Sequence, residues 1–302
     1  MISTNVLFFV FVTIVFNRDF GSSHPSTNQK NAGGCVVQQI CHDRPSPQEF
    51  TELVSLVKEM GKKLDVMEAK LDAVCSGECP SKRVPRNCAE VYKSGNKTSG
   101  VYTIRPDDGD AFDVYCDHST SGGGWTVFQK RLNGAVDFYR GWDNYKKGFG
   151  LMDGEFWLGL DKIHRLTNQT VNELRVDLED FNLAKAYAGY DLFKVENESK
   201  NYELNLGAYS GTAGDSLSKG NGMAFSTKDR DNDVWGKDCA GEHRAAWWYR
   251  TCHDSNLNGI YFQGHYTGRV NNAYAHGCVW KTWRGYYYSL KTVTMKIRPT
   301  CF

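Results

Sequence analysis

Eight apolar residues recur at alternating intervals of three and four, and this heptad repeat constrains the fold of the chain most strongly. They are Phe50, Leu53, Val57, Met60, Leu64, Met67, Leu71 and Val74. Ser46, Pro47 and Glu49 precede them as a capping box, which predicts the start of a helix. A stripe of two positions in seven is narrower than the face that a helix buries on its own domain. The repeat therefore predicts a coiled coil over residues 46–75 that joins copies of the chain, with packing on its own domain as the alternative.

Cysteines flank this helix on both sides, with Cys35 and Cys41 before it and Cys75 and Cys79 after it. Cys75 and Cys79 are placed to cross-link neighbouring chains, although a bond between the two stays open. Two prolines then end the helical pattern. We expect a flexible, Cys-containing segment over residues 23–45, a linker over 76–86 and a globular domain over 87–302.

The N-terminus carries an apolar run of eleven residues, 6–16, which is shorter than the roughly 20 residues that a membrane span requires. Polar and small residues follow it, so we predict a signal peptide over residues 1–22, with a signal anchor as the alternative. Ten cysteines and N-x-S/T sequons at Asn96, Asn168 and Asn197 fit an oxidising, glycosylating route. The sequence therefore predicts a secreted, extracellular glycoprotein without membrane insertion.

The charges of the chain are balanced, with 36 Lys and Arg residues against 35 Asp and Glu residues. No block of like charge stands out along the sequence. This distribution argues against a nucleic-acid partner and against a polybasic membrane anchor.

Short alternating runs predict strands half-buried on one face, and they cover residues 126–130, 174–178, 191–195 and 293–297. Helical patterns are few, the clearest lying around residues 161–166. Long loops rich in Gly, Asn and Asp separate these elements. The expected fold class is α+β, with an antiparallel sheet that feeds irregular loops.

Residues 247–259 read WWYRTCHDSNLNG, which closely resembles the hallmark segment of fibrinogen C-terminal domains. Further motifs of that family follow the same order along the chain at residues 112–117, 122–131, 138–142, 154–160 and 295–299. Within this fibrinogen-related family, the sequence is most similar to ficolins and tachylectin-type lectins. The resemblance covers about 215 residues and implies a globular domain with a twisted antiparallel sheet and long loops.

The resemblance also implies two disulfides, Cys88–Cys116 and Cys239–Cys252. Cys278 and Cys301 have no general counterpart in the family. We favour a bond between them within the chain, with bonds to the stalk cysteines as the alternative.

A calcium site is predicted in the segment 228–233, KDRDND, where carboxylates alternate along the chain. It is not an EF-hand, because the glycine at the sixth position and the glutamate at the twelfth are missing. The resemblance implies that Ca²⁺ is held by the side chains of Asp231 and Asp233 and by the backbone oxygens of Trp235 and Lys237. Asp229 is then expected to have a structural role.

A recognition site for acetylated sugars is implied by the same resemblance. Its residues are His243, Thr251, Cys252, His253, Tyr274 and Tyr286. The backbone N–H of Cys252 would bind the acetamido oxygen beside a cis Thr251–Cys252 peptide, and aromatic walls would hold the methyl group. His243 stands where related lectins often have tyrosine, which suggests a more polar slot or a sensitivity to pH near 6–7.

The function implied is that of a calcium-dependent lectin, oligomeric and active in innate immunity, which binds N-acetylated sugars on microbial or cell surfaces. A non-lectin glycoprotein that binds a receptor or the extracellular matrix is the alternative. Capture of a fibrin-type peptide is disfavoured, because His243 and Ala275 replace two acidic residues of fibrin-forming relatives. We do not expect an enzyme, since Cys252 would be held in a disulfide and so could not supply a thiolate beside His253.

Overall fold

The structure is a computed structural model and describes residues 46–76, 83–267 and 273–302. It divides into two compact units, residues 1–77 and 78–302. The predicted signal peptide, the whole segment 23–45 with Cys35 and Cys41, and Cys79 lie outside the described residues. None of the helices in the described part combines the length and apolarity needed to cross a membrane.

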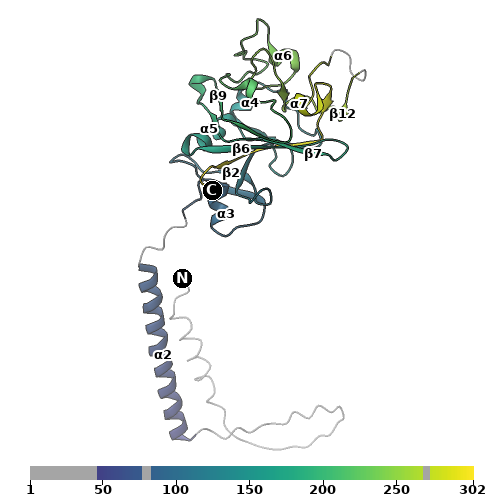
Figure 1. Cartoon of the computed structure of the whole chain (residues 1–302). Helices are drawn as coiled ribbons and strands as arrows, with labels where there is room; N and C mark the ends of the chain where they lie inside the picture. The colour runs from purple at the N-terminus through teal and green to yellow at the C-terminus, as the bar shows by residue number, and fades with distance from the viewer. Residues whose placement is uncertain (1–45, 77–82, 268–272) are drawn as a thin grey trace, which may run out of the picture. The chain divides into compact units, whose positions relative to one another are not determined.

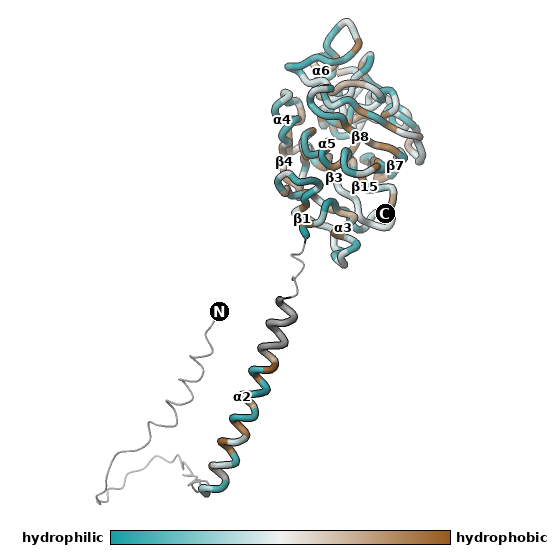
Figure 2. The backbone as a smooth tube through the Cα atoms, turned by 90° about the vertical axis from the view of Figure 1, so that its left-hand side faces the viewer, coloured by the Kyte–Doolittle hydropathy of each residue, from teal (hydrophilic) through white to brown (hydrophobic). Residues whose placement is uncertain are grey.

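Helix α2 (Pro47–Ser76) accounts for the described part of the first unit and follows the predicted helix closely. Its apolar residues stay exposed along the heptad stripe, with 53% of Phe50, 59% of Leu64 and 65% of Met67 accessible. Figure 2 shows brown, hydrophobic bands separated by teal, hydrophilic ones along α2. Among the described residues, no apolar side chain covers this stripe between Phe50 and Met67.

The second unit is built on an antiparallel sheet with the strand order β1-β2-β3-β15-β6-β7-β10. These strands are β1 (Gly100–Ile104), β2 (Phe112–Asp117), β3 (Trp125–Arg131), β6 (Asn172–Glu179), β7 (Lys185–Tyr190), β10 (Tyr209–Gly211) and β15 (Thr292–Pro299). The short strands β4 (Phe149–Gly150) and β5 (Phe156–Trp157) extend it beside β3. The α+β class and the antiparallel sheet are therefore confirmed.

Three small strand pairs stand apart from this sheet. They are β8 (Phe193–Val195) with β9 (Leu204–Leu206), β11 (Ser255–Asn256) with β13 (Val279–Trp280), and β12 (Gly264–His265) with β14 (Tyr288–Ser289). Two of these pairs lie in the C-terminal region that carries the candidate site.

Buried and half-exposed residues alternate along β6, and this alternation explains why one face of the sheet is buried and the other is polar. Leu174, Val176 and Leu178 are buried, whereas the residues between them are half-exposed. The buried side chains join a core that contains Trp157 and Trp248, and the other face of the sheet stays polar. An antiparallel sheet can leave one face in water in this way.

Short helices and loops cover the sheet. The helices are α3 (Cys88–Lys93), α4 (Trp142–Lys147), α5 (Leu160–Gln169), α6 (Cys239–His243) and α7 (Lys281–Arg284), with 3₁₀ turns at Glu198–Lys200 and Ser218–Gly220. Helices α4, α5 and α6 lie on the same side of the long strands β6 and β7 (Figure 1).

Buried Arg131 attaches the C-terminal loops to the main sheet. Its guanidinium donates hydrogen bonds to the backbone oxygens of Leu257 and Gly259, at 3.0 and 2.8 Å. Glu155 lies beside it, 3.6 Å from the Arg131 side chain. Arg131 therefore holds the end of the hallmark segment against the sheet, because a buried charged group with several partners is costly to displace.

Two disulfides join Cys88 to Cys116 and Cys239 to Cys252, which are the pairs implied by the resemblance. The expected bond between Cys278 and Cys301 is wrong, because both cysteines are free. Cys278 is buried, and its sulfur lies 3.3 Å from the backbone oxygen of Gly259, whereas Cys301 is exposed at the end of the chain. One thiol thus belongs to the core and the other to the surface.

Candidate functional site

A loop between the main sheet and α6 carries the predicted aspartates. Ser226 begins it and exchanges two backbone hydrogen bonds with Trp247, at 2.9 and 3.1 Å. The Trp247 and Trp248 rings are buried in the core. The tryptophan pair of the hallmark segment therefore holds the start of the acidic loop.

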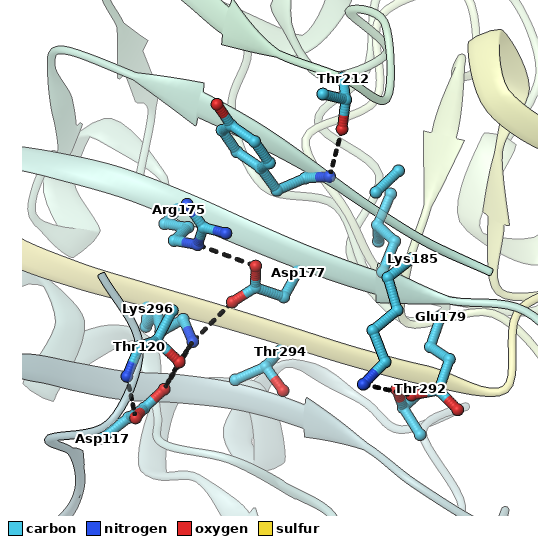
Figure 3. A pocket seen from close by; sticks show the side chains of 13 residues that line it. Asp117, Thr120, Arg175, Asp177, Glu179, Lys185, Thr212, Thr292, Thr294 and Lys296 are labelled. Carbon is cyan, nitrogen blue, oxygen red and sulfur yellow. Dashed lines mark hydrogen bonds and ion pairs between the residues drawn. The ribbon is translucent and has the colours of Figure 1, made fainter. Parts of the chain in front are cut away.

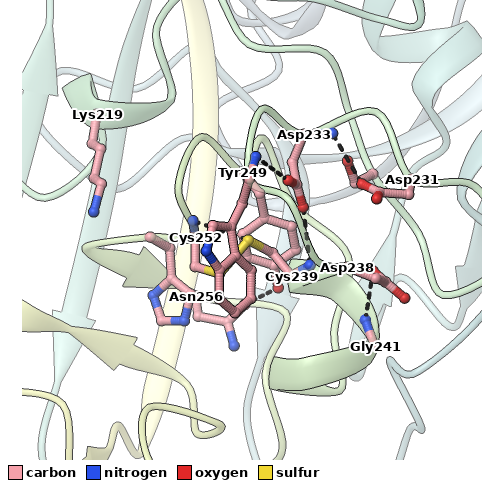
Figure 4. Close-up of a disulfide and its surroundings, with 12 residues drawn as sticks. Lys219, Asp231, Asp233, Asp238, Cys239, Gly241, Tyr249, Cys252 and Asn256 are labelled. Atoms are coloured by element: carbon pink, nitrogen blue, oxygen red, sulfur yellow. Dashed lines mark hydrogen bonds between the residues drawn. A yellow bond between two sulfur atoms is a disulfide. The ribbon is translucent and has the colours of Figure 1, made fainter.

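Three carboxylates converge in this loop (Figure 4). Asp231, Asp233 and Asp238 each offer an oxygen, and these oxygens lie within 4.8 Å of one another. We call these three residues the aspartate cluster. Asp238 was missed by sequence reasoning, although an aspartate directly before a short helix is a recognisable N-cap signal.

Backbone hydrogen bonds hold the cluster in shape. Asp233 accepts from the N–H groups of Trp235 and Cys239, at 2.7 and 2.9 Å. Asp238 caps α6 by accepting from the N–H of Gly241 at 2.9 Å. Two of the three carboxylates are therefore tied to the first turn of α6.

The chemistry of this donor set fits a hard cation. Partial burial raises the pKa of Asp233, and the neighbouring Asp231 carboxylate raises it further. Crowded carboxylates are the usual ligands of Ca²⁺, which takes six to eight oxygens at roughly 2.3–2.6 Å. The side chains present thus suit calcium, and Trp235 and Lys237 belong to the same loop.

Asp229 stands apart from the cluster. Its carboxylate accepts hydrogen bonds from the Thr227 hydroxyl at 2.6 Å and from the N–H of Trp142, the first residue of α4, at 2.9 Å. Burial raises the pKa of Asp229, but these hydrogen bonds outweigh it and leave the pKa below its usual value. This geometry supports the structural role expected for Asp229.

The Cys239–Cys252 disulfide links the aspartate cluster to the predicted recognition residues, because Cys239 opens α6 and Cys252 precedes His253 (Figure 4). The expected cis Thr251–Cys252 peptide is wrong: the described residues contain no cis peptide bond. Cys252 instead turns the chain through a left-handed backbone with φ of 55°. Its N–H lies 2.9 Å from the Cys239 sulfur and so is not directed to solvent.

Histidines and tyrosines meet on the other side of this disulfide. The ring centroids of His243 and His253 are 4.6 Å apart, those of His253 and Tyr286 are 6.1 Å apart, and those of Tyr286 and Tyr274 are 5.2 Å apart. We call these four residues the His–Tyr site. The structure thus brings together four of the six predicted recognition residues, with Thr251 and Cys252 adjoining His253 in the chain.

The His–Tyr site runs from the interior to the surface. Only 7% of His243 and 5% of His253 is accessible, whereas Tyr274 is 50% exposed. Neither ring nitrogen of His253 has a hydrogen-bond partner within the described part of the chain. A buried polar group left unpaired costs about 1–3 kcal/mol, so His253 is a strong candidate for contact with a ligand.

The pKa values of the histidines correct one expectation. Burial and, to a lesser extent, the nearby His276 together lower the pKa of His243 to about 4. The pKa of His253 also lies well below its usual value, because the ring is buried and His243 adjoins it. The predicted sensitivity of His243 near pH 6–7 is therefore wrong, since both rings are neutral in that range.

Tyr286 is oriented by polar contacts that the sequence did not reveal. Its hydroxyl donates to the Asp254 carboxylate at 2.7 Å, and Asp254 also pairs with Lys219 and Lys281, at 3.4 and 3.2 Å. Asp254 thereby fixes the outer wall of the His–Tyr site. These contacts join segments far apart in the chain, so no local pattern could have predicted them.

A separate hollow of about 510 Å³ lies on the polar face of the main sheet (Figure 3). Its charged side chains are largely paired with one another. Lys296 contacts Asp117 and Asp177 at 2.6 Å each, and Lys185 lies 3.7 Å from Glu179. These ion pairs belong to a water-facing sheet surface and leave no group poised for chemistry.

The predicted sequons lie at exposed positions. Asn96, Asn168 and Asn197 are all solvent-accessible. Glycosylation of these residues stays a prediction.

The sheet and its attached loops define a fibrinogen-like globular domain. Residues 84–300 match the family described as the C-terminal globular domain of fibrinogen beta and gamma chains, and the chain belongs to this family. Domains of this family are generally not enzymes.

The chain is similar to "Fibrinogen C domain-containing protein 1" of Xenopus tropicalis, with 46% identity over 286 residues. The match covers 89% of this chain and 62% of that relative, so the chain spans less than two thirds of its length.

Solved structures share the fold. The fibrinogen-like globe domain of human ANGPTL2 superposes with a TM-score of 0.69 at 46% identity, covering 71% of this chain and 99% of that domain. Lamprey fibrin D-dimer, complexed with the peptide Gly-His-Arg-Pro-amide, gives a TM-score of 0.68 at 36% identity, covering 83% and 87% of the two chains.

Proposed function

We propose that this chain is a secreted, calcium-dependent lectin that binds N-acetylated sugars through the His–Tyr site. The observation that carries this proposal is the buried His253, whose ring nitrogens have no partner in the described residues and which lies beside the Tyr286 ring. An acetamido group offers one hydrogen-bonding oxygen and one methyl group. The imidazole would form a hydrogen bond with the oxygen, and the tyrosine rings would contact the methyl group.

The acidic loop supports this role. Asp231 and Asp233, with the backbone oxygens of Trp235 and Lys237, would hold Ca²⁺, which would neutralise the crowded carboxylates. Asp233 already holds the N–H of Cys239, and Cys239 is bonded to Cys252 beside His253. An ordered acidic loop would therefore hold α6 in position and, through the disulfide, the ligand-binding residues as well.

Capture of a fibrin-type peptide has less support. The relative that holds Gly-His-Arg-Pro-amide is lamprey fibrin, and a charged peptide terminus calls for nearby carboxylates. At this site His243 and Ala275 are buried and carry no negative charge. A neutral acetamido group suits these residues better.

The chain would act outside the cell as an oligomer. The exposed heptad stripe of α2 would join copies of the chain, with Cys75 and Cys79 as cross-links. Weak single sites gain avidity when several are presented together, which suits recognition of microbial or cell surfaces in innate immunity.

Retention on an N-acetylglucosamine resin tests this function. We expect the protein to bind this resin in the presence of calcium and to elute with chelator or with free N-acetylglucosamine. Glucosamine, which lacks the acetyl group, is the matched competitor and should not elute it. Equal elution by both sugars, or retention unaffected by chelator, would contradict the proposal.

A further inference from the structure

Beside the His–Tyr site, a second exposed tyrosine extends the aromatic surface. Tyr287 is 40% exposed, and its ring centroid lies 5.5 Å from that of Tyr274. Tyr274 is therefore flanked by two rings, with Tyr286 at 5.2 Å towards His253 and Tyr287 on its other side. We call Tyr274 and Tyr287 the tyrosine platform.

Within the platform, Tyr287 is held in place by Tyr266, which is buried. The backbone N–H of Tyr266 donates to the backbone oxygen of Tyr287 at 3.0 Å, and its hydroxyl donates to the backbone oxygen of Tyr286. The Tyr266 and Tyr287 rings also contact each other, with centroids 6.0 Å apart. Tyr287 is thus held in position before any ligand arrives, which lowers the entropic cost of binding.

Strand pairing adds to this rigidity. Strand β14 begins directly after Tyr287, and its residues Tyr288 and Ser289 pair with His265 and Gly264 of β12. Tyr287 therefore directly adjoins a strand pair that links two separate segments of the chain.

We propose that the tyrosine platform is a second sugar subsite, which binds the residue next to the N-acetylated sugar in an oligosaccharide. A pyranose ring has an apolar C–H face and a polar rim, and an exposed tyrosine offers a flat apolar face with a hydroxyl at its edge. Because Tyr274 belongs to both sites, a ligand held against His253 and Tyr286 has its neighbouring sugar directed onto the platform. This inference rests on the proposed lectin function and adds that the chain selects N-acetylated oligosaccharides over single sugars.

Calorimetric titration of the full, calcium-loaded chain tests the subsite, with N-acetylglucosamine and its β-1,4-linked trimer as probes. We expect the trimer to bind about threefold to tenfold more tightly than the monosaccharide, as one aromatic contact provides. Tyr287→Ala should remove this gain and leave monosaccharide affinity unchanged. Tyr287→Phe, which keeps the ring, should retain most of it, and melting temperatures of both variants check the fold.

The outcomes separate the two proposals. If Tyr287→Ala keeps the full preference for the trimer, or if the unmodified chain binds both sugars equally, the subsite is refuted and the lectin function stands. If the unmodified chain binds neither sugar, both proposals fail.

Discussion

At the scale of single residues, the His–Tyr site depends on histidines that burial keeps neutral. His243 shows this most clearly, because its pKa of about 4 lies far below the ordinary value near 6.5. Between these two values the unfolded chain holds a proton that the folded chain does not. Stability therefore falls as the pH drops from about 6.5 to 4, by up to about 3 kcal/mol for this residue.

His243→Tyr should reduce this acid destabilisation. The substituted side chain does not titrate in this range, so the melting temperature should fall less steeply between pH 6.5 and 4 than in the unmodified protein. His265→Tyr, the same change at an exposed position of β12, is the control for the substitution itself. A slope unaffected by His243→Tyr would show that the folded chain accepts this proton readily.

Several residues of the site were predictable, and others were not. His253, Tyr274 and Tyr286 came from a family motif and meet in the structure. Asp254 could not be predicted, because it orients Tyr286 from a separate segment of the chain and no local pattern shows such a contact. Asp238 was missed although its capping of α6 is a local contact that the sequence does signal.

At the scale of elements, the disulfide between Cys239 and Cys252 joins the two halves of the site. It closes a loop with a sequence separation of 13, and such a bond stabilises a fold by about 3 kcal/mol. We expect Cys239→Ser with Cys252→Ser to lower both the melting temperature and the calcium affinity. The second effect follows because the N–H of Cys239 holds the Asp233 carboxylate.

Removal of the other disulfide, by Cys88→Ser with Cys116→Ser, gives the matched control. It should lower the melting temperature comparably and leave the calcium affinity unchanged, since it ties α3 to β2. Calcium affinities that respond alike to the loss of either bond would show no coupling between the Cys239–Cys252 bond and the aspartate cluster.

The long strands were predictable, and the short ones were not. β6 alternates between buried and half-exposed residues over all eight positions, and β15 does so over its first four, which is enough to show a period of two. β3 was predicted as well, although nearly all of its residues are buried. The pairs β11–β13 and β12–β14 have only two residues a strand and show no pattern. Cys278 was misassigned for a related reason, because no local feature showed that it enters the core.

At the scale of the whole molecule, the account requires α2 to assemble copies of the chain. Val57→Asp with Leu64→Asp places charges in the heptad stripe and should convert the oligomer into a monomer in sedimentation equilibrium. Ser55→Asp with Lys62→Asp alters the opposite side of the helix and should leave assembly unchanged. Oligomers that survive the substitutions in the stripe would contradict this role of α2.

The most direct test of the proposed function is a calorimetric titration of N-acetylglucosamine into two proteins. One is the calcium-loaded, unmodified chain, and the other is the double variant with Asp231→Asn and Asp233→Asn. The account predicts saturable binding to the unmodified chain and at least a tenfold loss in the variant, with melting in chelator confirming that both proteins fold. Equal sugar affinity in the two proteins would contradict it, because the aspartate cluster would then have no part in recognition.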